Sequence, residues 1–115
     1  MSDDPKRGDI WLVRLDPTIG SEIRKTRPAL IISNDINNRH APLVTVLPIS
    51  DKGEKVYPFE TGLSTGNTRL SKPSKIRCQQ IRTVDRIRLV KRLGHVDKEL
   101  LPDIEEALKL HLGIE

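Results

Sequence analysis

A polar, positively charged segment that runs into an apolar strand through an Arg-Pro step constrains this chain more than any other feature. The segment covers residues 20–33 and reads Gly-Ser-Glu-Ile-Arg-Lys-Thr-Arg-Pro-Ala-Leu-Ile-Ile-Ser. Proline disfavours the α region for the residue before it, so Pro28 holds the backbone of Arg27 extended. Pro28 also lacks an amide donor and suits the first position of a strand. The sequence therefore places a guanidinium group at a fixed point at the start of a rigid strand, which suits phosphate recognition better than core packing.

Short runs of aliphatic and β-branched residues predict a mainly β fold. An apolar stripe after Asp97 predicts a C-terminal helix to about Leu112, in which Pro102 marks the first turn if residues 98–101 are a lead-in. Short strands followed by one terminal helix are typical of an α+β or small-barrel fold. The predicted strands are Ile10–Leu15, Ala29–Ser33, Leu43–Ile49, a weaker edge strand Lys55–Glu60, Lys75–Ile81 and Val90–Val96. The intervening segments 16–27, 34–42 and 61–73 are predicted loops, and 83–89 is predicted as a turn or one helical turn.

Composition favours one small domain that acts on a polyanion. The chain has 115 residues, of which 36% are hydrophobic, with one Trp, one Tyr and one Phe, so the core is aliphatic and an oligomer is expected. Residues 1–6 are polar and are expected to form a disordered tail. Net charge is +4, but residues 97–115 hold six acids and two bases, so the rest of the chain is more basic still. A basic body suggests a partner such as nucleic acid.

The single cysteine and the short apolar runs indicate where in the cell the protein is expected. Cys78 cannot form an internal disulfide, which fits a reducing cytoplasm. The longest uninterrupted apolar run is four residues, 29–32, so no membrane span is expected.

Two predicted strands bring Arg27 and Ser50 to one edge of the sheet. If residues 28–33 and 43–49 pair as an antiparallel hairpin, the numbers of paired residues add to about 77, which places Arg27 opposite Ser50. A guanidinium and a hydroxyl then converge beneath the loop 16–27. The alternative is that Arg27 is a solvent-exposed charge and that Ser50 only opens a turn.

A second polar cluster, Gln79-Gln80-Ile81-Arg82, lies in a basic stripe. Adjacent amides at a strand end can hydrogen-bond the base edges of single-stranded RNA, although a plain polar strand face is the alternative. Residues 75–92 contain seven Lys or Arg and one acid, Asp85, which suits a phosphate backbone. The stripe has no aromatic residue, so base stacking has to come from elsewhere.

The sequence predicts no metal or cofactor. The three histidines are scattered without metal-ligand spacing, and no pair of acids lies in a metal-binding context. A glycine-rich phosphate loop and a dinucleotide fingerprint are both missing from the sequence.

Three ordered blocks of residues stand out when the chain is taken as a whole. The first block is Arg7-Gly8-Asp9-Ile10-Trp11, Gly20-Ser21-Glu22 and the run from Thr26 to Asp35. The second is Ser74-Lys75-Ile76, the run from Gln80 to Asp85 and Arg88-Leu89, and the third is Gly94-His95-Val96-Asp97 with the last helix. Together these blocks resemble the MazF/PemK toxin family over residues 7–112.

The resemblance implies a sequence-specific, metal-independent endoribonuclease that cuts single-stranded RNA, chiefly mRNA. Attack by the 2′-OH would leave a 2′,3′-cyclic phosphate and a 5′-OH. The resemblance further implies a single toxin domain over residues 7–115, folded as an SH3-like or CcdB-like β-barrel of about five to seven strands with a C-terminal helix. It also implies a homodimer and inhibition by an acidic, partly disordered MazE-like antitoxin.

The family's functional residues carry over by position. Arg27 matches the catalytic arginine, and Ser50 stands where the family has a catalytic Thr or Ser. Gln79 stands where some relatives carry an acid, so base preference is expected to differ. The RNA-binding residues implied in this way are Ser21, Glu22, Arg24, Lys25, Ser74, Gln79, Gln80 and Arg82.

Two other functions are compatible with parts of the sequence. A CcdB-like toxin that poisons gyrase would share the fold, but such proteins rely on a C-terminal Trp-Gly-Ile, and this chain ends Leu-Gly-Ile-Glu. A non-catalytic nucleic-acid binder would use only the basic stripe 75–92. Salt-sensitive binding without cleavage would identify it.

Overall fold

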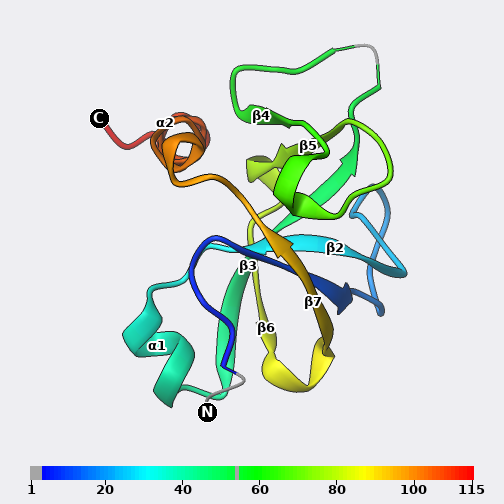
Figure 1. The fold of residues 1–115 in the computed structure, drawn as a ribbon, viewed down its shortest axis with the longest axis vertical. Coiled ribbons are helices and arrows are strands. Elements are labelled where there is room, and N and C mark those ends of the chain that lie inside the picture. The colour runs from blue at the N-terminus through cyan, green and yellow to red at the C-terminus, as the bar shows by residue number, and fades with distance from the viewer. Residues whose placement is uncertain (1–3, 54) are drawn as a thin grey trace.

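The computed structural model describes residues 4–53 and 55–115, in which seven strands form an antiparallel sheet (Figure 1). The strand order is β4-β5-β3-β2-β1-β7, and β6 pairs with β3 beside this path. The strands are β1 Asp9–Arg14, β2 Thr26–Ile31, β3 Leu43–Asp51, β4 Glu60–Leu63, β5 Ser74–Arg77, β6 Arg82–Asp85 and β7 Leu89–His95. The α-helices are α1 Asp35–His40 and α2 Leu101–Leu112, and the 3-10 helices are η1 Gly66–Thr68, η2 Cys78–Gln80, η3 Arg86–Arg88 and η4 Lys98–Leu100. The predicted class, mainly β with a C-terminal helix, is confirmed.

The long strand β3 joins the two halves of the sheet. Its earlier residues pair with β2 and β6, and its last three residues pair with β5. Because alternate residues of a strand face opposite sides, Leu30 and Leu47 enter one aliphatic core while Ile31 and Val46 enter another. The helix α2 covers the first core with Ile104. The sheet therefore has apolar residues on both faces.

The C-terminal helix begins later than a cap at Asp97 would give. Asp97 precedes η4, and α2 then begins at Leu101 with Pro102 in its first turn, so the alternative with residues 98–101 as a lead-in is the correct one. The helix ends at Gly113, which adopts a left-handed φ of 72° and donates its amide to the carbonyl of Leu110. The helix end thus agrees with the predicted Leu112.

Several predicted segments differ from the structure. The predicted turn 83–89 holds most of strand β6, Arg82–Asp85, and only its second part is the helical turn η3. The edge strand predicted at Lys55–Glu60 is wrong: the chain turns at 57–60, where the Glu60 amide donates to the Tyr57 carbonyl, and β4 begins only at Glu60. The predicted strand Lys75–Ile81 ends at Arg77 and continues as η2. The predicted loop 34–42 contains α1, because the Asn34 side chain accepts the Asn37 amide and caps a helix.

The predicted tail 1–6 is described only from Asp4 onward, and there the chain contacts the fold. Asp4 forms an ion pair with Arg86 at 2.6 Å. Pro5 is buried, and the Lys6 amide donates to the Asp9 carboxylate. Residues 1–3 lie outside the described part of the chain.

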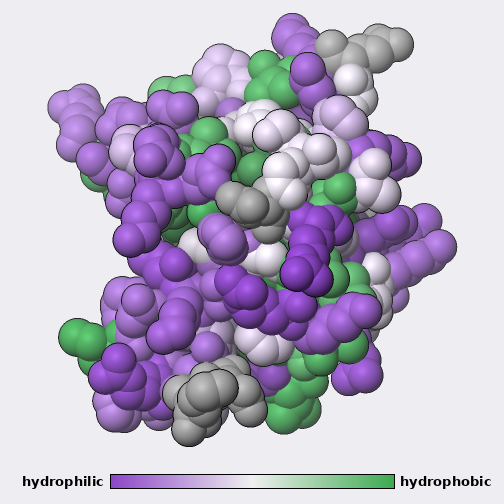
Figure 2. Space-filling view, in the orientation of Figure 1, coloured by the Kyte–Doolittle hydropathy of each residue, from purple (hydrophilic) through white to green (hydrophobic). Residues whose placement is uncertain are grey.

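The surface seen in Figure 2 is mostly hydrophilic, with apolar side chains gathered over the β6–β7 connection and a single apolar side chain, Ile36, exposed on α1. Among the described residues, no helix has the length and apolarity needed to cross a membrane.

Candidate active site

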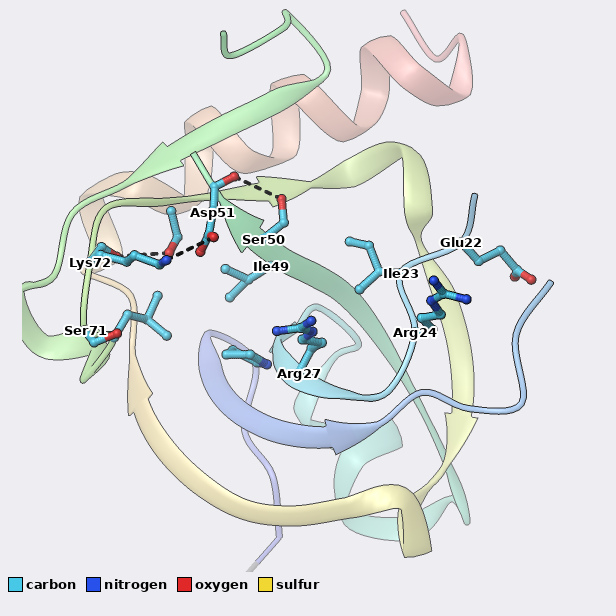
Figure 3. Close-up of a pocket in the computed structure, with 12 residues that line it drawn as sticks. Glu22, Ile23, Arg24, Arg27, Ile49, Ser50, Asp51, Ser71 and Lys72 are labelled. Atoms are coloured by element: carbon cyan, nitrogen blue, oxygen red, sulfur yellow. Dashed lines mark hydrogen bonds and ion pairs between the residues drawn. The ribbon is translucent and has the colours of Figure 1, made fainter. Parts of the chain in front are cut away.

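Arg27 and Ser50 lie where the hairpin register predicts. The β2–β3 ladder pairs Ala29 with Pro48 and Leu30 with Leu47, so paired numbers add to 77. Continued by two residues, this register sets Arg27 opposite Ser50. Both side chains line one open pocket of about 570 Å³ (Figure 3). The β2–β3 ladder itself ends at Ala29 and Pro48, and just beyond it Arg27 and Ser50 line the same pocket.

The pocket is built by three segments. The β1–β2 loop contributes Glu22, Ile23 and Arg24, and the end of β3 contributes Ile49 to Asp51. The third side comes from the chain that leads into β5, with Leu70, Ser71, Lys72 and the first β5 residue, Ser74, and these three segments surround Arg27 and Pro28 of β2. Figure 3 shows Arg27 between Ile23 on one side and the Asp51–Lys72 pair on the other, with the Ser50 hydroxyl directed at the Asp51 carbonyl. A phosphodiester would fit this setting, because the walls are polar and carry several cations.

Two cations of the pocket, Arg27 and Arg24, are not engaged by other side chains. Both are exposed, and neither side chain forms a hydrogen bond or ion pair with the other described residues. Lys72, by contrast, pairs with Asp51 at 3.1 Å. Ser50 makes only a long hydrogen bond, from its hydroxyl to the Asp51 carbonyl at 3.3 Å. Arg27 and Ser50 both keep hydrogen-bonding capacity for a ligand.

Cross-strand pairing extends this polar face beyond the pocket. Ser50 pairs with Lys75 on β5, and directly opposed residues of antiparallel strands point to the same side. Arg77 lies two residues further on β5, and Arg82 pairs with Val46, four residues before Ser50. The face of the sheet that carries the pocket thus also carries Lys75, Arg77 and Arg82.

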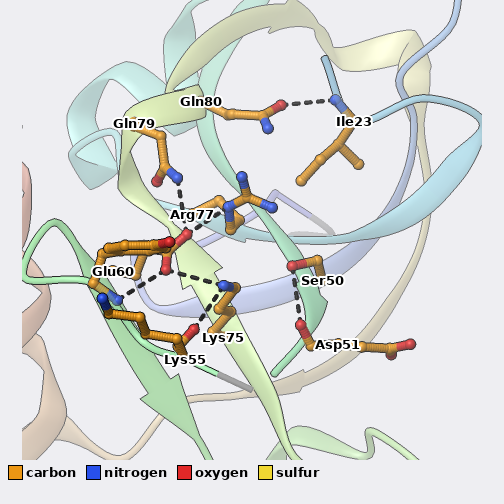
Figure 4. Close-up of polar contacts among 10 residues, drawn as sticks. Ile23, Ser50, Asp51, Lys55, Glu60, Lys75, Arg77, Gln79 and Gln80 are labelled. Atoms are coloured by element: carbon orange, nitrogen blue, oxygen red, sulfur yellow. Dashed lines mark hydrogen bonds and ion pairs between the residues drawn. The ribbon is translucent and has the colours of Figure 1, made fainter. Parts of the chain in front are cut away.

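A buried carboxylate, Glu60, organises two of these cations. Its side chain is 1% exposed and lies 3.0 Å from Lys75 Nζ and 2.7 Å from Arg77 Nε. It also accepts hydrogen bonds from Gln79 Nε2 and from the Tyr57 amide (Figure 4). Burial alone would raise the pKa of Glu60, but the hydrogen bonds from Gln79, Tyr57 and Lys75 outweigh it and hold the pKa below its ordinary value. Glu60 is therefore a charged anchor for β5.

Two predicted RNA-binding residues hold the β1–β2 loop instead of lining the pocket. Gln80 Oε1 accepts the Ile23 amide at 2.7 Å, and Arg82 Nη1 donates to the Leu15 carbonyl at 3.0 Å. These bonds connect the loop to η2 and β6, so they fix the wall of the pocket that Ile23 and its neighbours form. The contacts of Gln80 and Arg82 therefore indicate that these two residues support the β1–β2 loop.

The predicted site residues separate into two groups. Arg27, Ser50, Glu22, Arg24 and Ser74 line the pocket together. The others lie outside its lining: Ser21 and Lys25 are exposed on the β1–β2 loop, Gln79 binds Glu60, and Gln80 and Arg82 hold the loop.

Sequence reasoning missed Glu60 and Lys72, and it placed Lys75 and Arg77 in the basic stripe without the carboxylate that they share. That partner is recognisable only once β4 is paired with β5, which sets Glu60 opposite Arg77 and Gly62 opposite Lys75. The signal available in the sequence is the alternation of Lys75, Ile76 and Arg77, which marks one polar face on β5.

No metal or thiol chemistry is favoured by the arrangement of the described side chains. Residues 4–53 and 55–115 contain no group of three or more His, Cys, Asp or Glu that could hold a metal ion. Burial, and after it the charge of Glu60, raises the pKa of Cys78 to about 11, so this thiol is neutral near pH 7.

Comparison with known proteins gives a consistent match along the chain. A family model described as a PemK-like, MazF-like toxin of type II toxin-antitoxin systems matches residues 6–112. The endoribonuclease MazF9 of Mycobacterium tuberculosis is 41% identical over 114 residues, which cover 95% of this chain and 97% of that protein. The endoribonuclease EndoA of Bacillus subtilis is 36% identical over 110 residues, covering 95% of each chain.

Solved structures show the same fold. The crystal structure of MazE–MazF (form II) from Deinococcus radiodurans superposes with a TM-score of 0.78 at 25% identity, covering 99% of this chain and 100% of that chain.

Proposed function

Because this chain belongs to the family of PemK-like, MazF-like toxins of type II toxin-antitoxin systems, we propose that it is an endoribonuclease that cuts single-stranded RNA without a metal ion. The observation that carries the proposal is that Arg27 and Ser50 line one pocket. The similarity to proteins named as endoribonucleases supports it.

RNA supplies its own nucleophile, so the site need only position the strand and stabilise charge. The 2′-OH attacks the adjacent phosphorus, the bond to the 5′ oxygen breaks, and the products are a 2′,3′-cyclic phosphate and a 5′-OH. Arg27 holds the non-bridging oxygens as negative charge grows on them. A fixed donor of this kind is typically worth about 2.7–4 kcal/mol.

Arginine stays protonated at any physiological pH, so Arg27 acts as a cation and a donor and not as the general base. Ser50 orients the phosphate or the 2′-OH through its hydroxyl. It forms no covalent intermediate in this scheme, because the internal 2′-OH is closer to the phosphorus.

RNA recognition is proposed to come from the pocket walls and from the loop that Gln80 and Arg82 support. Ser21, Glu22, Arg24, Lys25 and Ser74 are the proposed direct contacts. Gln79, Gln80 and Arg82 are proposed to contribute to RNA binding at the strand edge. They also hold Glu60, Ile23 and Leu15, respectively, in place. The polar face with its cations supports this assignment.

The proposed unit is a single toxin domain over residues 7–115 that works as a homodimer in the cytoplasm and is inhibited by a MazE-like antitoxin. The family description and the solved MazE–MazF pair support the antitoxin. An acidic disordered segment suits a basic groove, since it is an extended polyanion like RNA. Competition between RNA and the antitoxin is the expected signature, and simultaneous tight binding at the groove would count against it.

The test is digestion of a mixed-sequence RNA with and without EDTA, beside the Arg27→Ala variant. We expect sequence-specific cuts that persist in EDTA, cyclic phosphate ends, and no cutting by a folded Arg27→Ala protein. Cutting by Arg27→Ala at the wild-type rate removes Arg27 from the mechanism. A parallel gyrase supercoiling assay separates the CcdB-like alternative, and salt-sensitive RNA binding without product identifies a non-catalytic binder.

A further inference from the structure

The fold supplies an aromatic surface beside the basic stripe, although the stripe itself has no aromatic residue. Tyr57 and Phe59 lie just before β4, and their rings stack with centroids 5.5 Å apart at an interplanar angle of 2°. Tyr57 is 42% exposed, so an aromatic ring backed by a second ring is presented to solvent. Stacked pairs of this kind are rigid and lose little entropy when they bind a flat ligand.

Cations surround the Tyr57 ring. Lys55 Nζ lies 4.8 Å and Lys75 Nζ 5.7 Å from its centroid. Together with Arg77 they set three cations against the single carboxylate of Glu60. An aromatic ring with surplus positive charge is the combination that binds single-stranded nucleic acid, because bases stack on the ring and phosphates meet the cations.

Hydrogen bonds fix Tyr57 relative to the catalytic pocket. The Tyr57 amide donates to Glu60 Oε1 at 3.0 Å, and the Tyr57 carbonyl accepts the Glu60 amide at 2.9 Å. Glu60 in turn holds Lys75, which is the cross-strand partner of Ser50. Figure 4 shows Lys75 between Glu60 on one side and Ser50 on the other. The Lys75 side chain therefore connects the Tyr57 ring to the neighbourhood of Ser50.

We propose that Tyr57 forms a nucleobase-binding subsite, on which a base close to the scissile phosphate stacks while the exposed Lys55 faces a phosphate that flanks it. This inference rests on the proposed ribonuclease function and deepens it. The occupant is a base of single-stranded RNA, because only a flat ring attached to a polyanion matches both the aromatic face and the charge.

The base has to displace Lys55 from the ring, and the magnitudes favour this exchange. A cation over an aromatic ring at an exposed site changes an equilibrium by about two- to fivefold. Stacking of one base on an aromatic side chain changes affinity by about five- to 150-fold. Lys55 is exposed, so its ammonium can leave the ring and approach a phosphate when the base arrives.

The test uses an RNA that carries a 2′-deoxy sugar at the mapped cut site, which removes the nucleophile. 2-Aminopurine is placed at each position around this site in turn, and its fluorescence falls when it stacks. The proteins are wild type, Tyr57→Phe, which keeps the ring, and Tyr57→Leu, which removes it. We expect quenching at one or two positions with wild type and Tyr57→Phe. With Tyr57→Leu the quenching is lost and affinity falls by about five- to 150-fold.

An abasic nucleotide at the quenched position gives a second reading that needs no protein variant. It should weaken wild-type binding by the same factor and should add nothing to the loss caused by Tyr57→Leu. Equal affinity of wild type and Tyr57→Leu with the quenching retained overturns the subsite. Abasic losses of the same size in both proteins also overturn it. If wild type cuts no RNA, the proposed function itself fails, which is a separate result.

Discussion

Replacement of the buried carboxylate by an amide, Glu60→Gln, tests whether Glu60 anchors β5. The side chain is 1% exposed and holds Lys75 and Arg77, whose side chains are 12% and 27% exposed. Loss of one member of a buried ion pair costs about 3–5 kcal/mol. We expect the lower end, about 3 kcal/mol, because both cations retain some contact with water.

That loss is large enough to measure by thermal unfolding. For a chain of 115 residues, an unfolding entropy of roughly 2.1 cal/mol/K per residue gives about 0.24 kcal/mol/K, so the Tm should fall by about 12 °C. The matched control is Glu105→Gln, which removes an exposed carboxylate that pairs with Arg7 at 3.0 Å. Such a surface pair contributes about 0–1 kcal/mol. A fall in Tm for Glu60→Gln no larger than that for Glu105→Gln would refute the assignment of Glu60 as an anchor.

The pH dependence gives an independent reading of the same perturbation. The pKa of Glu60 is lowered in the folded protein. A carboxyl of this kind contributes stability above the pKa of the unfolded chain and loses it as the pH falls through the folded value. The difference in unfolding free energy between wild type and Glu60→Gln should therefore be full at pH 7 and should shrink below about pH 4.3, the ordinary value for Glu. A difference that grows in acid would contradict this sign.

Three further predictions concern the loop, the hydroxyl and the thiol. Gln80→Leu removes the acceptor of the Ile23 amide, so hydrogen exchange of that amide should speed up by about two- to 13-fold. The exchange rate of the Leu30 amide in β2 should stay unchanged. Equal exchange rates of the Ile23 amide in wild type and variant would show that Gln80 does not hold the loop. Ser50→Thr should keep cleavage within a few-fold of wild type, because the hydroxyl remains, whereas Ser50→Ala should lower it by about 100-fold; equal rates for the two variants would remove the hydroxyl from the reaction. Because the pKa of Cys78 is raised to about 11, a disulfide reagent at pH 8 should react only after unfolding, and rapid reaction of the native protein would contradict its burial.

The placement of Arg27 and Ser50 follows from local sequence. Pro28 sets the start of β2, and the turn formers after it set a hairpin whose register needs only a count of residues. The six-residue helix α1 inside that connection did not change the register, because both strands keep their alternation of core residues.

The Glu60 network was not predictable in the same way. Its members come from β4, β5 and η2, and Lys75 and Arg77 reach the Glu60 carboxylate only through the pairing of β4 with β5. Gln80 and Arg82 are a related case. The sequence marks them as polar strand-end residues, but only the packed loop shows that their partners are backbone groups of Ile23 and Leu15.

The most direct test of the central claim is a double-mutant cycle between Arg27 and Ser50 on single-turnover RNA cleavage, with Arg27→Lys and Ser50→Ala so that residual rates stay measurable. Groups that act on the same phosphodiester as a unit are strongly non-additive. We predict that the double variant is hardly slower than the slower single variant. A double-variant loss equal to the product of the two single losses would show that the guanidinium and the hydroxyl act independently.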